Sequence, residues 1–357
     1  MYVNVKISNF CYIPYSFLLL LQKLISQSVS VNMSLLKIQQ PIEAEFSAFK
    51  EYYATLFRSN IPLLNRALSH VNRSNGKMMR PMLVLLVAKG VAGRVGECSN
   101  YAAASLELLH TASLLHDDVV DESPMRRGVP SLHTLFSNRI AILAGDYIFS
   151  SALQNASLTR NVEIVEALSL LGQQLSKGEL LQLQLQQSGG FSEENYIEII
   201  RNKTASLFAT CCRFGALSVG ADAETVEAFA RFGELLGICF QIKDDIFDYY
   251  DSAEVGKPTG SDMREGKITL PALYVLNNTD SDFARELLAK LSEGYTMSDA
   301  EIEILIALSK DAGGIDYALR RIEEFRAEAL ALIPASVSDE MREVLTLYLD
   351  FAISRNK

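Results

Sequence analysis

Apolar residues recur at steps of three and four along most of the chain from about residue 40 onward, and alternation of apolar and polar residues is almost absent. The segment EIVEALSLLGQQLSKGELLQLQLQQ, residues 163–187, shows this spacing clearly. One buried face of an α-helix requires such spacing. The stretch between Pro130 and Pro258 contains no proline, which leaves room for long helices because proline disfavours helix interiors. The pattern therefore predicts an all-α fold.

Short helix-breaking segments separate the predicted helices. They are SNG at 74–76, ESP at 122–124, SGG at 188–190 and the longer DSAEVGKPTGSDMREGK at 251–267. Most helical segments look apolar over more than half of their circumference, which is typical of helices packed in a bundle core. The chain has 357 residues, of which 49% are hydrophobic, and it contains no linker, low-complexity tract or short repeat. We predict a single all-α domain over residues 33–357.

The first 32 residues differ from the rest of the chain. They contain KISNFCYIPYSFLLLLQKLI, in which an apolar run follows a lysine and is interrupted by Pro14 and Ser16. The run is too short to span a bilayer, and the following SQSVSVN fits a signal-peptide cleavage site only loosely. We interpret residues 1–32 as an extension outside the fold, with Met33 as the true start. A secretion signal is the alternative.

The composition narrows the classes of function. The formal net charge is −10, which argues against a protein that coats nucleic acid. The five cysteines form no CxxC pair, and the four histidines show no HExxH spacing. A zinc site is therefore not expected, and the cysteine usage suits a reducing compartment such as the cytoplasm.

Two acidic triplets stand out because each directly follows an apolar run. They are HDDVVD and KDDIFD, and their carboxylates belong to Asp117, Asp118, Asp121, Asp244, Asp245 and Asp248. At about 100° per residue, the outer two members of a triplet lie roughly 40° apart on one helix face. Carboxylates that face one cavity repel each other unless cations lie between them. Oxygen-only ligands of this kind suit Mg²⁺ that also contacts substrate phosphates.

A solvated acidic face is the usual role of a single DDxxD motif, and it is the alternative here. The triplet occurs twice, however, and each copy follows apolar rather than charged sequence. Burying unpaired carboxylates is costly, so they need a partner. The repetition therefore favours metal binding.

Basic and polar residues accompany the triplets. Those singled out are Lys77, Arg80, His110, Arg126, Arg127, Lys203, Thr204, Lys257 and Lys267. Each alone is most simply a solvated side chain, but together they predict two anion sites. One site would be bridged to the aspartates through metal, and the other would be held directly by Lys and Arg donors. The chain contains no GxxxxGK[ST] loop and no GxGxxG turn, so a nucleotide is not the expected ligand.

Five motifs, in order, resemble those of the trans-isoprenyl diphosphate synthases, also called polyprenyl synthetases. They are GKMMRP, ELLHTASLLHDDVVDESPMRRGVPSLH, the KT of RNKTASL, FQIKDDIFD and GKPTGSDMREGKITLP, and the resemblance runs from about residue 40 to the C-terminus. It implies a large antiparallel helical bundle around a deep central cavity, usually as a homodimer. It also implies head-to-tail condensation of an allylic diphosphate, farnesyl or geranylgeranyl, with isopentenyl diphosphate. The implied cofactors are two to three Mg²⁺ ions, for which Mn²⁺ can substitute.

The resemblance also implies roles for single residues. Mg²⁺ would be bound by Asp117, Asp121 and Asp244, with support from Asp118, Asp245 and Asp248. The allylic diphosphate would be held by Arg126, Lys203, Thr204, Gln241, Lys257 and Lys267. Isopentenyl diphosphate would be held by Lys77, Arg80, His110 and Arg127. All of these positions carry the expected residue type, whereas Met78 stands where many relatives have a basic residue.

The expected chemistry needs no protein nucleophile. Ionisation of the allylic C–O bond places charge on the departing diphosphate, where Mg²⁺ and the Lys and Arg side chains stabilise it. The double bond of the second substrate attacks the allylic cation, and the released diphosphate takes up the proton. An apolar cavity keeps water away from the cation. The carbonyl of Lys203 or the hydroxyl of Thr204 would steady the cation if the helix kinks there.

Helix geometry gives an expectation for product length. The prenyl tail should run along the helix that precedes Asp117, where Ala112 and Ser113 are small and Leu109 lies deeper. A Phe or Tyr at position 112 would close the cavity early. With about three helix residues of depth per isoprene unit, we expect a product of roughly six to ten units, such as a quinone side-chain precursor. In the alternative, Ala112 only packs against a neighbouring helix that forms the cavity floor.

Several other functions stay open. A farnesyl or geranylgeranyl diphosphate synthase of shorter product would share every motif, and a non-catalytic partner subunit would keep the fold but lose aspartates that are complete here. A terpene cyclase needs no second diphosphate site, so Lys77, Arg80 and Arg127 argue for condensation. A Ca²⁺-binding helical protein is disfavoured because no EF-hand spacing occurs. Peripheral membrane contact would help to release so apolar a product.

Overall fold

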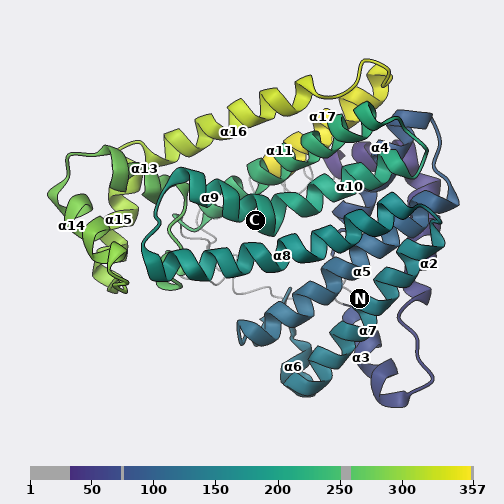
Figure 1. The fold of residues 1–357 in the computed structure, drawn as a ribbon, viewed down its shortest axis with the longest axis horizontal. Coiled ribbons are helices and arrows are strands. Elements are labelled where there is room, and N and C mark those ends of the chain that lie inside the picture. The colour runs from purple at the N-terminus through teal and green to yellow at the C-terminus, as the bar shows by residue number, and fades with distance from the viewer. Residues whose placement is uncertain (1–32, 74–75, 251–258, 355–357) are drawn as a thin grey trace, which may run out of the picture.

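Helices make up almost all of the regular structure in the computed structural model, which describes residues 33–73, 76–250 and 259–354 (Figure 1). In these ranges the sheet consists of two strands, β1 (Met125–Arg126) and β2 (Val129–Pro130). The prediction of an all-α fold is confirmed. The small hairpin was not predicted, because strands of two residues are too short to show alternation. The predicted extension over residues 1–32 lies outside the described residues.

The first half of the described chain builds the helices around the first acidic triplet. After the 3-10 turn η1 (Gln40–Ile42) come α2 (Glu43–Thr55), α3 (Pro62–Arg73), α4 (Met79–Ala92), α5 (Glu97–Val120), α6 (Leu132–Leu135), α7 (Asn138–Leu158) and α8 (Val162–Ser188). Helices α5 and α7 are antiparallel neighbours. His116 near the end of α5 lies 3.3 Å from the carbonyl of Ile142, whereas Cys98 at its start lies 3.7 Å from the carbonyl of Thr159.

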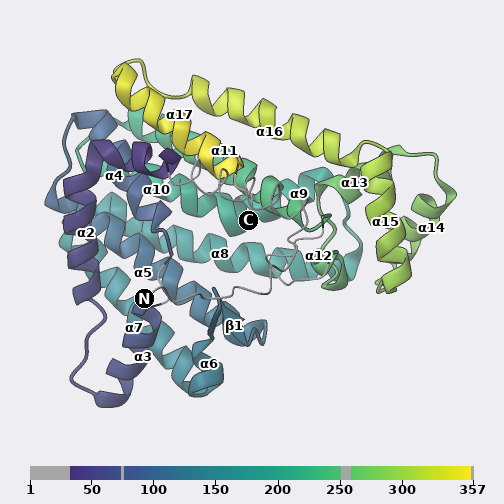
Figure 2. The same cartoon turned by 180° about the vertical axis from the view of Figure 1, so that it is seen from behind.

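The second half of the chain carries the second triplet. Its elements are α9 (Glu193–Ile200), the π-helical turn η2 (Arg201–Ala205), α10 (Ser206–Leu217), α11 (Ala223–Phe247), α12 (Ser261–Arg264), α13 (Leu270–Asn278), α14 (Asp282–Ser292), α15 (Asp299–Asp311), α16 (Gly314–Ala331) and α17 (Asp339–Ser354). Both views place α14 and α15 at one end of the molecule and α2 and α3 at the other (Figures 1 and 2). Among the described helices, none is both long enough and apolar enough to cross a membrane.

The buried apolar side chains form two clusters that share α11. One cluster includes Leu85 of α4 and Leu106 of α5, and the other includes Ile242 of α11 and neighbours from α9 and α13 to α16. Phe325 and Ile353 pack against both clusters. Helix α11 therefore runs through the whole core before it ends at the second triplet. That residues 33–357 form a single domain stays a prediction.

Glycines allow α11 to lie unusually close to its neighbours. A Cβ at Gly233 would lie 2.4 Å from the carbonyl oxygen of Phe208, and a Cβ at Gly237 would lie 2.5 Å from the Cα of Ala205. No side chain fits in such gaps. Because the two glycines are one turn apart, they bring α11 into contact with both η2 and α10. The contact places the second triplet beside the Lys203–Thr204 segment.

Helix ends follow the expected capping chemistry. Helix α8 begins after Asn161, whose Oδ1 accepts a hydrogen bond from the Glu163 backbone at 2.9 Å. It ends at Gly189, which has φ of +75°, and a Cβ there would lie 2.5 Å from the Cα of Ser292. The break at 188–190 predicted from the sequence is thus confirmed as the end of the long helix.

Candidate active site

The acidic triplets lie at the C-terminal ends of α5 and α11. Asp121 follows the last residue of α5, and Asp248 follows the last residue of α11. A helix C-terminus carries partial negative charge, so carboxylates are unfavourable there unless cations are near. Cations lie near both ends: Lys203 and Arg126 favour the ionised form of Asp117, and against the effect of burial the pKa of Lys267 is raised mainly by Glu265, then by Asp262 and, from the first triplet, by Asp121. The structure therefore brings both triplets to one polar region.

The middle aspartate of the first triplet holds an arginine. Asp118 is only 2% exposed, and its Oδ1 accepts a hydrogen bond from Nε of Arg126 and forms an ion pair with Nη2 of the same guanidinium, each at 2.6 Å. The carboxylate of Asp118 has lost its water, and a charge-assisted pairing of this kind fixes the guanidinium, although the Arg126 side chain is itself 34% exposed. Asp118 thus orients the arginine that the sequence assigned to the allylic diphosphate.

The second triplet also turns two carboxylates toward the protein. Asp245 accepts hydrogen bonds from the Tyr196 hydroxyl and the Gln241 amide, each at 2.7 Å. Burial, with repulsion from neighbouring acids, raises the pKa of Asp245 to about 8. Asp248 accepts hydrogen bonds from the backbone N–H groups of Ser261 and Asp262, at 3.0 and 3.1 Å. These two residues anchor α9 and the 259–264 segment to the end of α11.

The outer carboxylates have a different environment. Asp117 is open to solvent on one side, but partial burial and repulsion from Asp121 and Glu179 raise its pKa to about 6. Such repulsion is the pattern that a divalent cation relieves, and the donor set consists of oxygen atoms alone. Within the described residues, no three His, Cys, Asp or Glu side chains form a ready-made metal cluster. The residues present fit ions that are shared with a phosphate ligand.

Lys203 lies in the irregular turn between α9 and α10. It forms an ion pair with Glu179 and donates a hydrogen bond to Gln182 Oε1 at 3.0 Å. The chain adopts a π-helix over Arg201–Ala205, a rare conformation that often marks functional sites. The helix irregularity considered in the sequence analysis is thus present. Thr204 donates to Gln241 Oε1 at 2.7 Å, and Gln241 in turn donates to Asp245.

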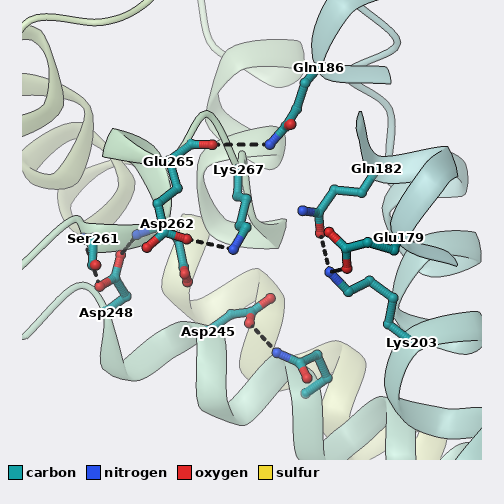
Figure 3. A network of polar contacts seen from close by, with 11 residues as sticks. Glu179, Gln182, Gln186, Lys203, Asp245, Asp248, Ser261, Asp262, Glu265 and Lys267 are labelled. Atoms are coloured by element: carbon teal, nitrogen blue, oxygen red, sulfur yellow. Dashed lines mark hydrogen bonds and ion pairs between the residues drawn. The ribbon is translucent and has the colours of Figure 1, made fainter. Parts of the chain in front are cut away.

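A cavity of about 200 Å³ opens beside these residues, and its lining includes Lys203, Thr204, Gln241, Asp244, Asp245, Asp262 and Lys267. Figure 3 shows Lys203 reaching toward α8 and Lys267 on the opposite wall, with Asp245 between them. Lys267 donates to Glu265 Oε2 at 2.6 Å. Four residues of the predicted allylic set therefore line this cavity, whereas Arg126 is paired with Asp118 of the first triplet. Lys257 lies outside the described residues.

The hairpin after α5 presents two arginines. Arg126 ends β1, and the turn consists of Arg127 with φ of +51° and Gly128 with φ of +78°. Two positive φ angles define a type I′ turn, whose twist matches that of a two-stranded hairpin. The turn fixes Arg127 at the tip, where its guanidinium lies against Gly76. A Cβ at Gly76 would be 2.7 Å from Arg127 Nη1.

The residues predicted to bind isopentenyl diphosphate also lie in one region of the fold. Burial, with the charges of Arg80 and Arg127, holds the pKa of His110 well below its usual range, so the imidazole is neutral. The Arg80 guanidinium lies 5.3 Å from the centre of the Phe208 ring, and Lys77 Nζ lies 5.7 Å from that of Phe351. Both are cation–π distances.

The C-terminal helix supports this second basic set. Tyr348 of α17 is fully buried and donates a hydrogen bond to the carbonyl of Met79 at 2.9 Å. That carbonyl lies between Lys77 and Arg80, and Phe351 of the same helix lies under Lys77. The sequence did not assign a role to either aromatic residue, since only the fold brings residues so distant in sequence together.

The predicted chain-length residues lie along α5. Ala112 and Leu109 are 1% and 2% exposed, and Ser113 donates a hydrogen bond to the His110 carbonyl at 2.9 Å. The lining of the 200 Å³ cavity includes none of the three. Their role in product length stays a prediction.

Several residues at the site were not singled out from the sequence. They are Glu107, Glu179, Gln182, Tyr196 and Asp262. One signal was available: Gly178 interrupts a helical pattern next to Glu179, and a glycine there often marks a close approach. A Cβ at Gly178 would indeed lie 2.7 Å from Lys203 Cγ.

Comparisons with known proteins agree with this geometry. The sequence profile of the family described as Polyprenyl synthetase matches residues 61–307. The chain is 30% identical over 326 residues to the octaprenyl diphosphate synthase of Escherichia coli strain K12, covering 91% of this chain and 100% of that protein.

Two solved structures have a similar fold. One is a geranylgeranyl pyrophosphate synthase from Bacteroides thetaiotaomicron, with 46% identity, a TM-score of 0.77 and coverage of 90% of this chain and 99% of that one. The other is a decaprenyl diphosphate synthase from Rhodobacter capsulatus, with 33% identity, a TM-score of 0.81 and coverage of 89% and 98%. The sequence profile, the relatives and the fold lead to one conclusion: the chain belongs to the polyprenyl synthetase family.

Proposed function

We propose that this protein condenses an allylic diphosphate head-to-tail with isopentenyl diphosphate and repeats the step to make a long all-trans polyprenyl diphosphate. The observation that carries the proposal is the presence of two separate basic sets beside the acidic triplets. One set surrounds Lys203 and Lys267, and the other surrounds Arg80 and Arg127. An enzyme with one diphosphate substrate would need only the first set.

The side chains that would bind the allylic diphosphate come from different parts of the site. Lys203, Thr204 and Lys267 offer donors to the allylic diphosphate from two walls of the cavity, and Arg126 approaches from the first triplet. The diphosphate gains negative charge as the C–O bond breaks, so these fixed donors stabilise the leaving diphosphate more than they stabilise the intact, already anionic ester. The ammonium group of Lys203 is paired with Glu179, and that of Lys267 is paired with Glu265. Substrate must therefore displace or join these pairs.

Asp117, Asp121 and Asp244 would hold Mg²⁺ ions against the allylic diphosphate. Their oxygen ligands match the preference of Mg²⁺, and like-charge repulsion at Asp117 is what such ions would relieve. When bound, the ions supply Lewis-acid stabilisation of the leaving diphosphate. Asp118, Asp245 and Asp248 contribute by fixing Arg126, α9 and the segment that leads to Lys267.

The experiment that tests the function is a product assay. The full chain is incubated with Mg²⁺, farnesyl diphosphate and labelled isopentenyl diphosphate, and products are separated by chromatography. Elongation that stops in excess EDTA supports the proposal. Consumption of the allylic substrate without isopentenyl diphosphate would indicate a cyclase, and no consumption would indicate a non-catalytic partner subunit.

A geranylgeranyl diphosphate synthase is the second candidate, and one observation favours it. The 46% identical structure is a geranylgeranyl pyrophosphate synthase, whereas the octaprenyl and decaprenyl synthases are 30% and 33% identical. The small side chains of Ala112 and Ser113 support the longer product. Replacing Ala112 by Phe should shorten the product if the tail passes this position, and an unchanged product distribution would contradict the tail path.

We also propose that the protein is a homodimer that pairs through α7. This helix leaves apolar side chains exposed on much of its surface, namely Ile142, Leu143, Tyr147, Phe149, Leu153 and Leu158 at 39 to 56% exposure. Several exposed apolar side chains on one helix are typical of an interaction surface. A second copy of the chain is the simplest occupant, because most soluble oligomers are symmetric homodimers. Membrane contact for product release and a cytoplasmic location stay predictions.

A further inference from the structure

Tyr196 is a buried tyrosine whose hydroxyl group contacts the second acidic triplet, and the proposed reaction gives this residue no role. It lies on α9 and is 6% exposed. Its hydroxyl donates a hydrogen bond to Oδ2 of Asp245 at 2.7 Å. Asp245 is also 6% exposed, and a buried carboxyl group needs hydrogen-bond partners in place of the water that it has lost. Tyr196 supplies one of these partners.

The other oxygen of Asp245 is bound by Gln241. Its Nε2 donates a hydrogen bond to Oδ1 of Asp245 at 2.7 Å. Gln241 lies one turn before Asp245 on the same helix, α11, so it moves together with that helix. Tyr196 comes from another element, α9. Because the two donors bind different oxygens, they fix the rotation of the carboxyl group, and Tyr196 is the donor that ties it to the rest of the site.

The hydrogen bonds continue from Gln241 to the π-helical turn η2. Thr204 Oγ1 donates to Gln241 Oε1 at 2.7 Å. A side-chain amide has a donor end and an acceptor end. Both oxygens of Asp245 accept hydrogen bonds, so Gln241 turns its nitrogen toward Asp245 and its carbonyl oxygen toward Thr204. The chain of hydrogen bonds therefore allows one orientation of the amide.

The orientation of this amide matters because Gln241 lines the 200 Å³ cavity, together with Lys203 and Lys267. Its Nε2 carries a second hydrogen, which is the donor that this side chain can offer to an anion. If the amide were turned over, its carbonyl oxygen would take the place of that hydrogen. Two acceptors repel each other, so the turned amide would oppose the binding of a diphosphate.

We propose that Tyr196 is a positioning residue for the allylic diphosphate: its hydroxyl holds Asp245, and Asp245 in turn holds the Gln241 amide with its nitrogen available to the ligand. Without the hydroxyl, Oδ2 of Asp245 loses its donor from α9, and the carboxyl group is free to rotate away from Gln241. The inference deepens the proposed function and rests on it, because it takes this cavity to be the allylic site.

A purely structural role is the alternative. The Tyr196 ring belongs to the same buried apolar cluster as Ile200 and Leu273, and packing of the ring could be its whole contribution. Tyr196→Phe separates the two roles, because it keeps the ring and removes the hydroxyl. Tyr52→Phe is the matched control. It removes a hydroxyl that donates to Asn155 Oδ1 at 2.6 Å, between α2 and α7.

The test measures ligand binding by the full chain with isothermal titration calorimetry in the presence of Mg²⁺. Farnesyl diphosphate and isopentenyl diphosphate are titrated separately, so no elongation takes place. Tyr196→Phe should raise the Kd for farnesyl diphosphate about five- to tenfold, as expected for one lost hydrogen bond, and should change the Kd for isopentenyl diphosphate less than about twofold. Tyr52→Phe should change neither Kd.

A double-mutant cycle tests whether the effect passes through Gln241. Gln241→Met keeps the length of the side chain and removes the amide. If Tyr196 acts through that amide, adding Tyr196→Phe to Gln241→Met should raise the Kd for farnesyl diphosphate less than about twofold further. Independent effects would multiply, and that result overturns the inference. If Tyr196→Phe does not fold, Asp245→Asn takes its place in the cycle, and multiplied effects overturn the inference there too.

The remaining outcomes separate the inference from the function. An unchanged Kd for farnesyl diphosphate in Tyr196→Phe overturns the inference, and so does an equal rise in both Kd values. A lower melting temperature with unchanged Kd values shows the purely structural role and also overturns it. A wild-type chain that never elongates farnesyl diphosphate in the product assay overturns the proposed function itself.

Discussion

Neighbouring carboxylates in each acidic triplet have different surroundings, although they are chemically identical. Asp118 is 2% exposed and paired with Arg126, whereas Asp117, one residue earlier, is open to solvent and repelled by Asp121. On a helix, adjacent residues point about 100° apart, so Asp118 faces the protein and Asp117 faces solvent. At the residue scale, position on the helix therefore decides whether an aspartate supports the site or offers ligand oxygens.

This division predicts different defects for two conservative variants. Asp118→Asn keeps a hydrogen bond to Arg126 but loses the charge, which contributes roughly 1.5–3 kcal/mol in a charged hydrogen bond. The KM for the allylic substrate should rise about 10- to 100-fold, with Mg²⁺ dependence unchanged. Asp117→Asn should instead raise the Mg²⁺ concentration needed for half-maximal rate. Steady-state kinetics at a series of Mg²⁺ concentrations distinguishes the two variants. Identical defects in both would contradict the different roles assigned to Asp117 and Asp118.

A surface cap far from the cavity makes a pH prediction. Glu301 accepts hydrogen bonds from the Ser298 backbone and hydroxyl at 2.9 and 2.7 Å, and from Tyr295 at 2.8 Å. These contacts, the backbone one first, lower the pKa of Glu301 from 4.5 to about 2. The ionised form is favoured in the folded state, so its stabilisation is present above pH 4.5 and is lost as the pH falls toward 2.

Glu301→Gln should therefore lower the urea midpoint of unfolding at pH 7 and flatten its decline between pH 4.5 and 2. Glu303→Gln, on the exposed side of the same helix, is the matched control and should leave the decline unchanged. Equal acid sensitivity of Glu301→Gln and the wild type would show that the cap makes no contribution.

At the scale of elements, the site depends on how closely α8 approaches η2. The sequence pattern predicts α8 as a helix but gives no distance to its neighbours. Gly178 lies directly against Asn202 and Lys203, whereas Gly172, nearly two turns earlier on α8, has open space around a Cβ. The two glycines have the same helical backbone, so they separate the effect of helix propensity from that of crowding.

Gly178→Ala and Gly172→Ala should have opposite effects. Alanine favours a helix over glycine by about 1 kcal/mol. At position 178 overpacking costs roughly 1–3 kcal/mol, which outweighs that gain and pushes Lys203 away from the cavity. The variant should unfold at lower urea concentration and show a higher KM for the allylic substrate, whereas Gly172→Ala should be slightly stabilised. A stabilised Gly178→Ala with unchanged KM would show that the gap is not needed.

At the scale of the whole molecule, the apolar face of α7 is the feature that a single chain leaves unexplained. Leu143 is 56% exposed, and Leu153 on the same helix is 39% exposed. Helix α15, at another part of the molecule, also carries one exposed apolar residue, Ile304 at 49%. Single exposed residues are ordinary, but a row of them on one helix is not.

The double variant Leu143→Glu and Leu153→Glu should convert a dimer into a monomer, because it buries two charges in the proposed interface. Size-exclusion chromatography with light scattering measures the mass directly. Ile304→Glu is the control and should leave the oligomeric state unchanged. A wild-type chain that runs as a monomer at all concentrations would contradict the proposed homodimer.

Much of the candidate site was readable from local sequence, because its motifs are short and its ligands are charged. The triplets, the Lys203–Thr204 segment and the basic residues of GKMMRP and SPMRRG all stand out in the sequence, and the structure describes them all. Lys257, which the sequence also predicts at the site, lies outside the described residues. Glu179, Asp262 and Glu107 were missed, because a single carboxylate on a helix looks the same whether it faces solvent or a lysine from another helix.

The sequence alone determined that the chain is helical, where the long helices break and which side chains carry the chemistry. Those properties depend on periodicity and residue type, which are local. Only the tertiary structure decided that Asp118 holds Arg126, that Asp248 caps the 261–262 backbone and that Glu107 is buried. These roles depend on contacts between elements that close packing brings together. Hydrophobic periodicity predicts which face of a helix is buried, but it does not predict which other helix covers that face.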